Sequence, residues 1–225
     1  MAKYNIYIIC KTEEDFLKKS KEISDKYKSK ICHIQWIPAE YLKLTQCNKK
    51  LIKDLNTRWN TSKPKILSKL GTIAAHRKAL LAIYMNKTDN NIVLEADATL
   101  SSKLPAPPQT SCYMGGWIIP PQITKAGLVK MNIHPKKGLN SIDYDKFSVL
   151  MAHALFIKTF EEAMELFQTT ITDQIKNYDV HLIDMKFFQH YYYPPIFVQG
   201  KHISEIDGVT NKNDQWTHFY GLHTN

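Results

Sequence analysis

Residues 91–99, Asn-Ile-Val-Leu-Glu-Ala-Asp-Ala-Thr, are the stretch from which we predict the fold class of this chain. The apolar run 92–94 predicts a short buried strand, and Glu95 and Asp97 follow it with only Ala96 between them. In an open α/β sheet, ligands gather at the carboxyl ends of the strands. Two carboxylates there, with Ala96 letting the backbone approach closely, predict an oxygen site for Mg²⁺ or Mn²⁺ that holds a diphosphate. A strand followed by a solvated acidic turn is the alternative, because acid-x-acid is common.

The composition predicts a single globular domain over residues 1–225. An apolar fraction of 44% is ordinary for a globular protein and argues against general disorder. The net charge of +9 favours anionic partners, such as nucleotide diphosphates, nucleic acid or acidic glycans. The four cysteines form no C-x-x-C pair, so we expect reduced thiols and a cytoplasmic location. We find no signal peptide and no apolar stretch long enough to span a membrane.

The first forty residues predict a β-α-β unit, the first half of a nucleotide-binding sheet. Strand 4–10 leads into a helix with Thr12 as its N-cap and Asp15 three residues on, and a second strand, 31–37, ends at Pro38. We expect the end of the first strand to lie beside the base or ribose of a nucleotide. The residues concerned are Ile9, Cys10, Lys11 and Thr12. A simple connection between the strand and the helix is the alternative.

Residues 67–84 predict a strong helix that leads directly into the strand before Glu95. His76 and Arg77 interrupt its face of small residues, and Arg77 could clamp a phosphate with two hydrogen bonds. A single histidine on a helix is more often a packed or surface residue than a functional one. We nevertheless place both residues in the predicted nucleotide-sugar site.

The second half of the chain supplies further candidates for the predicted nucleotide-sugar site. Gly115 and Gly116 lie in a predicted strand over 112–119, and glycines inside a strand mark places where a ligand or another backbone approaches closely. His153 lies in a second predicted strand, 147–157, which Thr159 and Glu162 follow as the start of a helix. We expect 1–100 to form the nucleotide-binding half, 101–200 the sugar and acceptor half, and 201–225 a tail that folds over the site.

Four blocks resemble glycosyltransferase family 25, the family of lipopolysaccharide and collagen sugar transferases. Residues 71–76, Gly-Thr-Ile-Ala-Ala-His, resemble its G-C-x-x-S-H block, and 92–97 resemble its L-E-D-D block. Residues 154–157 are similar to its A-Y-L-I strand, and 195–199 to its P-x-x-x-Q block. The order and spacing agree over about residues 67–206. The chain also looks like the small glycosyltransferase domains of large algal DNA viruses.

The resemblance implies a GT-A fold, a Rossmann-like α/β/α domain with a mixed central sheet. It implies a donor that is a nucleoside diphosphate sugar, usually of uridine, with Mn²⁺ or Mg²⁺ as cofactor and a hydroxyl of a glycan or glycoprotein as acceptor. The chain departs from the family where Thr72 and Ala75 replace Cys and Ser, and where Glu95-Ala96-Asp97 replaces the paired aspartates. Asp97 is therefore the firmer candidate for a metal ligand.

A second resemblance lies near the end of the chain. Residues 217–221, Thr-His-Phe-Tyr-Gly, are similar to the H-F-x-G of glycogenin-like enzymes, which retain the configuration of the sugar, although the K-P-W that follows there is absent. It implies that His218 is the third metal ligand beside Glu95 and Asp97, and that Gly221 borders the nucleotide sugar. It slightly favours retention.

The chemistry requires charge stabilisation at the diphosphate and a carboxylate beside the reacting carbon. Asp184 and Asp179 are the candidates for this catalytic carboxylate, because both lie in the segment that resembles the family's D-x-x-L block. A metal-dependent nucleotidyltransferase would share the acidic pair, but the chain lacks an early glycine-rich phosphate loop. A basic nucleic-acid-binding protein ranks last, because the basic residues are scattered and do not form one patch with interleaved aromatics. We therefore predict no nucleic acid partner.

Overall fold

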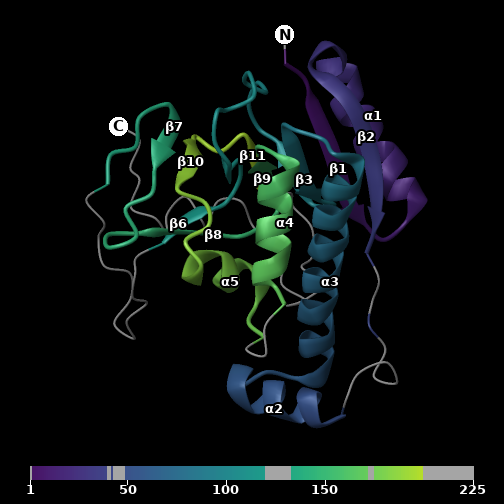
Figure 1. Ribbon diagram of the computed structural model, residues 1–225, viewed down its shortest axis with the longest axis vertical. Helices are drawn as coiled ribbons and strands as arrows, with labels where there is room; N and C mark the ends of the chain where they lie inside the picture. The colour runs from purple at the N-terminus through teal and green to yellow at the C-terminus, as the bar shows by residue number, and fades with distance from the viewer. Residues whose placement is uncertain (1, 40–41, 43–48, 120–132, 172–174, 200–225) are drawn as a thin grey trace.

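The computed structural model describes residues 2–39, 42, 49–119, 133–171 and 175–199, which form an α/β fold around one mixed sheet (Figure 1). The sheet has seven strands in the order β2-β1-β3-β9-β5-β10-β7. Their bounds are Ile31–Pro38 (β2), Tyr4–Cys10 (β1), Asn91–Glu95 (β3), Ala154–Ile157 (β9), Cys112–Tyr113 (β5), His190–Tyr193 (β10) and Gly138–Ser141 (β7). β1, β2 and β3 are parallel, whereas β9 runs antiparallel to β3. The predicted β-α-β opening is confirmed.

Two antiparallel ribbons lie outside this sheet. One pairs β4 (Ala98–Leu100) with β11 (Phe197–Gln199), and the other pairs β6 (Trp117–Ile119) with β8 (Ser148–Leu150). The predicted strands 112–119 and 147–157 are therefore each broken in two. The breaks fall at residues with positive φ, Gly116 (130°) and Met151 (88°), a backbone conformation that a regular strand does not use.

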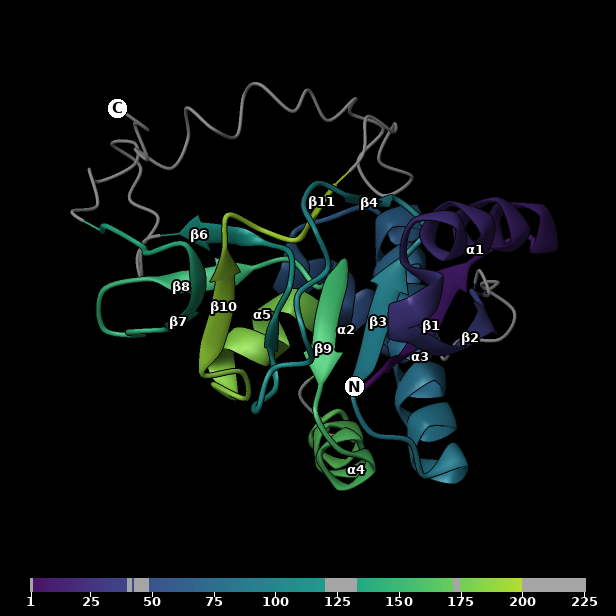
Figure 2. The same cartoon turned by 90° about the horizontal axis from the view of Figure 1, so that it is seen from above.

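Helices cover both faces of the sheet, with α1 and α4 on opposite sides (Figure 2). The helical elements are α1 (Glu13–Tyr27), the 3-10 helix η1 (Lys28–Lys30), α2 (Lys49–Trp59), α3 (Lys63–Asn86), α4 (Phe160–Thr169) and α5 (Tyr178–Asp184). Thr12 accepts a hydrogen bond from the Asp15 amide (3.2 Å) and Thr159 accepts one from the Glu162 amide (3.2 Å). Both predicted N-caps are confirmed. Within the described residues, no helix is both long and apolar enough to cross a bilayer.

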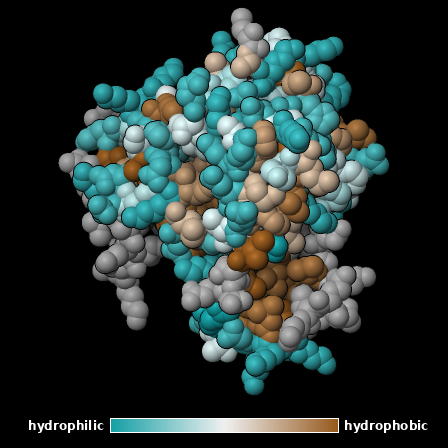
Figure 3. All heavy atoms as spheres, viewed as in Figure 1, coloured by the Kyte–Doolittle hydropathy of each residue, from teal (hydrophilic) through white to brown (hydrophobic). Residues whose placement is uncertain are grey.

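Alternating side chains of the central strands divide the core into two layers. Ile8 and Leu94 pack on the α1 side with Ile23, whereas Ile9 and Val93 pack on the side of α3 and α4. β1 is buried along its whole length, as expected of a parallel strand covered on both faces. A third apolar cluster joins α2 to the first half of α3, where Figure 3 shows hydrophobic surface low in the view. Its buried members are Ile52, Leu55, Ile66 and Leu70.

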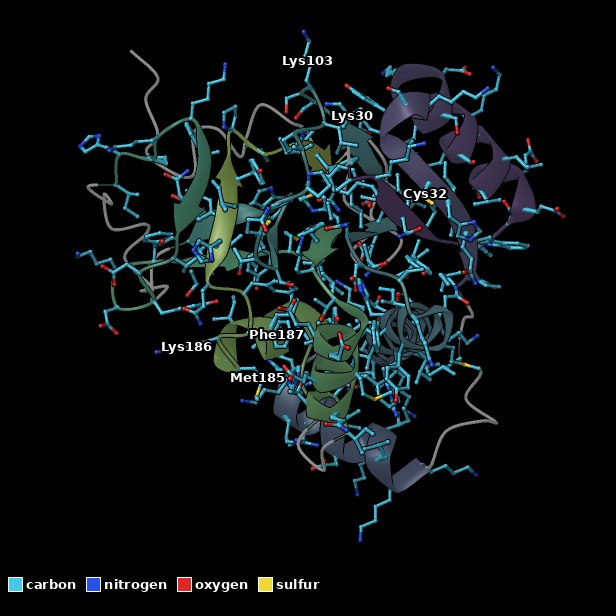
Figure 4. All side chains as sticks on the ribbon, turned by 45° about the horizontal axis from the view of Figure 1, so that its top comes forward. Lys30, Cys32, Lys103, Met185, Lys186 and Phe187 are labelled. Atoms are coloured by element: carbon cyan, nitrogen blue, oxygen red, sulfur yellow. The ribbon has the colours of Figure 1, made fainter. Side chains whose placement is uncertain are left out.

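The described cysteines are free thiols, as the sequence predicted. Cys10 and Cys112 are buried in the sheet, and Cys32 is exposed on β2, the strand at the edge of the sheet (Figure 4). Burial raises the pKa of Cys10 to about 11, with a further contribution from the charge of Asp15. Cys47 lies outside the described residues.

Gly116→Ala should destabilise the protein more than Gly138→Ala does. Both glycines have positive φ (130° and 110°), so each substitution incurs backbone strain of about 1–3 kcal/mol. Only at Gly116 would the new Cβ also meet neighbouring atoms, the Leu150 carbonyl oxygen and Val149 Cγ1, each at 2.8 Å. We expect this contact to add about 1–3 kcal/mol to the loss in free energy of unfolding, measured in urea. Equal losses would show that packing against β8 does not constrain Gly116.

Candidate active site

Glu95 and Asp97, the acidic pair, lie at the carboxyl end of β3, as we predicted from the sequence. Glu95 is the last residue of β3, and Ala96 and Asp97 form a turn that leads into β4. Glu95 is in register with Ile9 near the end of the parallel strand β1, so the carboxyl ends of both strands meet there. Lys19 of α1 donates a hydrogen bond to the Ala98 carbonyl (2.7 Å) and holds the chain just after the turn.

Glu95 is anchored by a histidine from α3. His76 Nε2 donates to Glu95 Oε1 at 2.9 Å, and the His76 side chain is only 1% exposed. The imidazole ring stacks on Tyr178 with ring centroids 4.1 Å apart. Burial raises the pKa of Glu95, but the hydrogen bond from His76 and the charges of His76 and His153 outweigh it, so the pKa is lowered overall. Glu95 therefore stays ionised at neutral pH.

Asp97 has the opposite electrostatic environment. Gln199 of β11 donates from Nε2 to Asp97 Oδ2 at 2.7 Å, whereas Asp97 Oδ1 is buried and has no hydrogen-bond partner within the described structure. Burial and the negative charge of Glu95 raise the pKa of Asp97, and the bond from Gln199 only partly opposes them. The pair therefore holds more negative charge than its surroundings compensate.

His153 lies behind the pair and explains one of the two glycines. Its side chain is fully buried, its Nε2 lies 3.3 Å from the Phe197 carbonyl oxygen, and its own carbonyl accepts from the Glu95 amide (2.9 Å). A Cβ on Gly115 would collide with the His153 ring. Gly115 thus provides space for His153, and Gly116 for β8. Of the two partners expected for these glycines, a ligand or another backbone, the structure shows the second: a Cβ would lie 2.8 Å from the Phe197 carbonyl oxygen at Gly115 and 2.8 Å from the Leu150 carbonyl oxygen at Gly116.

The structure separates the two predicted catalytic carboxylates. Asp179, in the first turn of α5, is half-buried, and burial and the charge of Glu95 raise its pKa, partly opposed by the Val180 amide and Lys69. Asp184, at the end of α5, is exposed and forms an ion pair with Lys176. Met185 and Lys186 continue from it in an exposed turn, and Phe187 follows them (Figure 4). The charge of Glu95 thus reaches Asp179, in the first turn of α5.

The residues at the end of β1 have local structural roles. The Cys10 carbonyl accepts hydrogen bonds from Trp36 Nε1 and from the Ala39 amide, both at 3.0 Å. Thr12 caps α1, and Lys11 is exposed beside it. The acidic pair and this strand end nevertheless lie on the same edge of the sheet.

Arg77 does not lie with the acidic pair. Its guanidinium carbon is 5.1 Å from the centroid of the Phe167 ring, so the side chain packs on α4. The predicted phosphate clamp at this position receives no support from the contact. His218 and Gly221 lie outside the described residues.

The acidic pair fits a divalent cation as two of its ligands. Asp97 Oδ1 is a buried carboxylate oxygen without a partner, and a bound cation would offset the repulsion that raises the pKa of Asp97. Over the described ranges, no cluster of three or more His, Cys, Asp and Glu side chains is arranged to hold a metal. A complete site would therefore draw further ligands from a substrate, from water or from residues outside those ranges.

Sequence reasoning missed two side chains of this site. Gln199 ends the 195–199 block, and its position in that block is the signal that could have drawn attention to it. Tyr178 carried no signal, because its role is to stack on His76, which is distant in the sequence.

Asp97→Asn should stabilise the protein at neutral pH, because it removes a buried charge while Asn can still accept from Gln199. The native pKa of Asp97 lies above its usual value of about 3.8. In the wild-type protein, the free energy of unfolding therefore falls as the pH rises from about 3.8 through the native pKa of Asp97. At pH 3 this loss is absent. By calorimetry without divalent cations, we expect the variant Tm to be higher by about 2–4 °C at pH 7 and equal at pH 3. The same gain at both values would contradict the charge argument.

Comparisons with known proteins assign no family. No family model matches the chain, and no curated protein matches it. Among solved structures, the UTP-bound UGPase from Acinetobacter baumannii aligns with 85% of this chain and 86% of its own, at 12% identity and a TM-score of 0.40. This score is too low to support a common fold or a common activity.

Proposed function

We propose that this protein is a GT-A glycosyltransferase that moves a sugar from a nucleoside diphosphate sugar, a UDP-sugar, to a hydroxyl of a glycan acceptor. The mixed sheet with helices on both faces and an acidic pair at the carboxyl end of a central strand supports the proposal. The observation that carries it is the buried, unpartnered Oδ1 of Asp97 beside the ionised Glu95. A solvated acidic turn, the alternative reading of the sequence, would leave neither carboxylate buried.

Glu95 and Asp97 would hold Mn²⁺ or Mg²⁺, with His218 as the predicted third protein ligand. When bound, the ion stabilises the negative charge that develops on the diphosphate as the sugar leaves. His76 keeps Glu95 ionised and oriented through the bond at 2.9 Å. Gln199 orients Asp97 through the other carboxylate oxygen, which leaves Oδ1 available.

Asp179 is the carboxylate that we place beside the reacting carbon. A general base works best when its pKa is close to the operating pH, and the pKa of Asp179 is raised toward it by burial and by Glu95. In an inverting reaction Asp179 accepts the proton of the acceptor hydroxyl. In a retaining reaction the leaving phosphate takes that proton, and Asp179 stabilises positive charge on the sugar. Asp184 is exposed and paired with Lys176, so we assign it no role in transfer.

Asp97→Asn should weaken Mn²⁺-dependent binding of UDP by about 100-fold or more, because it removes the charge of a metal ligand. Isothermal titration calorimetry with UDP in the presence and absence of Mn²⁺ measures the effect. Asp25→Asn is the matched control, since Asp25 is an exposed acid of α1 that pairs with Lys21. Unchanged affinity in Asp97→Asn would refute the metal site. Release of pyrophosphate from UTP and a sugar phosphate would instead identify a nucleotidyltransferase.

Asp179→Asn should lower the rate of UDP release from a UDP-sugar by about 100-fold to 10,000-fold, the range for removing a general base, while UDP and Mn²⁺ still bind. The assay uses the UDP-sugar that the wild-type chain hydrolyses fastest. Asp184→Asn, five residues further along α5, should lower the rate by less than about tenfold, because its carboxylate faces solvent. The reverse order of effects would move the catalytic carboxylate to Asp184.

A further inference from the structure

The positive charge is less evenly scattered than we expected from the sequence, because two thirds of the net charge of the chain lies in one helical hairpin. Residues 49–69 comprise α2 and the first two turns of α3, and we call them the basic hairpin. They contain seven basic residues and one acidic residue, a net charge of +6 out of +9 for the whole chain. The acidic residue, Asp54, is paired with Arg58 at 2.6 Å. Lys49, Lys53 and Lys63 are exposed.

The basic hairpin projects past the edge of the sheet that carries the acidic pair. Figure 1 shows α2 beyond every strand, at the end toward which the arrowhead of β2 points, and β1 and β3 run parallel to β2. His76 meets Glu95 from the middle of α3, so the thirteen residues 63–75 extend about 20 Å beyond that contact. Figure 3 shows hydrophobic surface on the visible face of this region and hydrophilic surface below it, at the lower end of the molecule.

A lysine and a tryptophan connect the hairpin to the candidate active site. Lys69 lies two helical turns before His76 on α3, about 10 Å along the axis. Its Nζ lies 5.6 Å from the centroid of the Trp59 ring, which ends α2. Burial raises the pKa of Asp179, and so does the charge of Glu95, whereas the charge of Lys69 lowers it. Positive charge thus begins beside the proposed catalytic carboxylate and continues outward over the hairpin.

We infer that the acceptor of the transfer is an acidic glycan, whose negative groups bind along the basic hairpin while its hydroxyl enters the site beside Asp179. The inference rests on the proposed function, and it names the class of acceptor. Lys69 lies about 10 Å from the level of His76, so the nearest negative group lies on a sugar beyond the one that reacts. Exposed lysines bind anions as mobile point charges, which suits a polymer with carboxylates or phosphates at repeated intervals.

Two other polyanions fit the hairpin less well. Binding of single-stranded nucleic acid depends on bases stacked on several aromatic rings, whereas Trp59 is the sole aromatic residue in 49–69 and Lys69 lies over its ring. Binding to a membrane surface needs exposed apolar side chains beside the lysines. None of the large exposed hydrophobic side chains of the described residues belongs to 49–69, and Ile52, Leu55 and Ile66 are buried between the helices.

The test compares a labelled oligogalacturonate with a neutral maltooligosaccharide of the same length, by fluorescence anisotropy with the full chain. We expect the acidic probe alone to bind, with an affinity that falls as salt increases. The triple variant Lys49→Gln, Lys53→Gln and Lys63→Gln should bind it about tenfold more weakly. The control is Lys18→Gln, Lys26→Gln and Lys28→Gln, which removes the same charge from exposed positions on and just after α1 and should bind within about twofold of wild type.

Three outcomes would overturn the inference. The first is equal binding of the neutral and acidic probes. The second is equal weakening in the two triple variants, which would reduce the effect to net charge. The third is tighter binding of oligodeoxythymidylate, or of vesicles that contain phosphatidylserine, than of the acidic glycan.

Calorimetry of the wild-type chain with UDP and Mn²⁺ tests the proposed function separately. UDP binding without any preference for the acidic probe refutes the inference alone. Binding of the acidic probe without UDP binding refutes the proposed function, and with it the role of the glycan as acceptor.

Discussion

The bond between His76 and Glu95 is the interaction on which the candidate site depends. Glu95 lies at the end of a parallel strand, where burial by itself would raise its pKa and favour the neutral carboxyl group. His76 reverses that effect, and it can do so only because α3 crosses the strand ends at this residue. Tyr178 stacks on the face of the imidazole ring and fixes its orientation. Sheet, α3 and α5 therefore meet at one ionised carboxylate.

When two carboxylates lie close together, their repulsion raises the pKa of at least one of them, and the environment of each decides which one. Here Glu95 has a buried histidine as its partner, whereas Asp97 has one neutral amide and one oxygen without a partner. The protein compensates the first charge internally and leaves the second uncompensated. Such an arrangement costs stability in the free chain and is typical of a site that binds a cation or a proton.

Local patterns in the sequence predicted the elements that form this site, but not the contacts between distant segments. The buried strand at 92–94, the capped helix after Thr12 and the long helix through His76 follow from periodicity and caps, which act over a few residues. The breaks at Gly116 and Met151 depend on the pairing of β6 with β8, which no local pattern encodes. Asp179 and Asp184 were equivalent in the sequence, and only the packing of α5 distinguishes them.

The length of α3 connects the two electrostatic features of the protein. With 24 residues it is far longer than the five-residue strand β3 that follows it, so its first half extends past the sheet and carries positive charge there. Its middle supplies His76, which keeps negative charge at the strand end. The acids at the end of β3 and the lysines of the basic hairpin lie about 10–20 Å apart along the axis of α3, and they attract different parts of a ligand: the acids a cation, and the lysines an anion. A substrate that brings a metal-bound diphosphate and a negative chain satisfies both at once, which is why we regard one helix as the element that orients donor and acceptor.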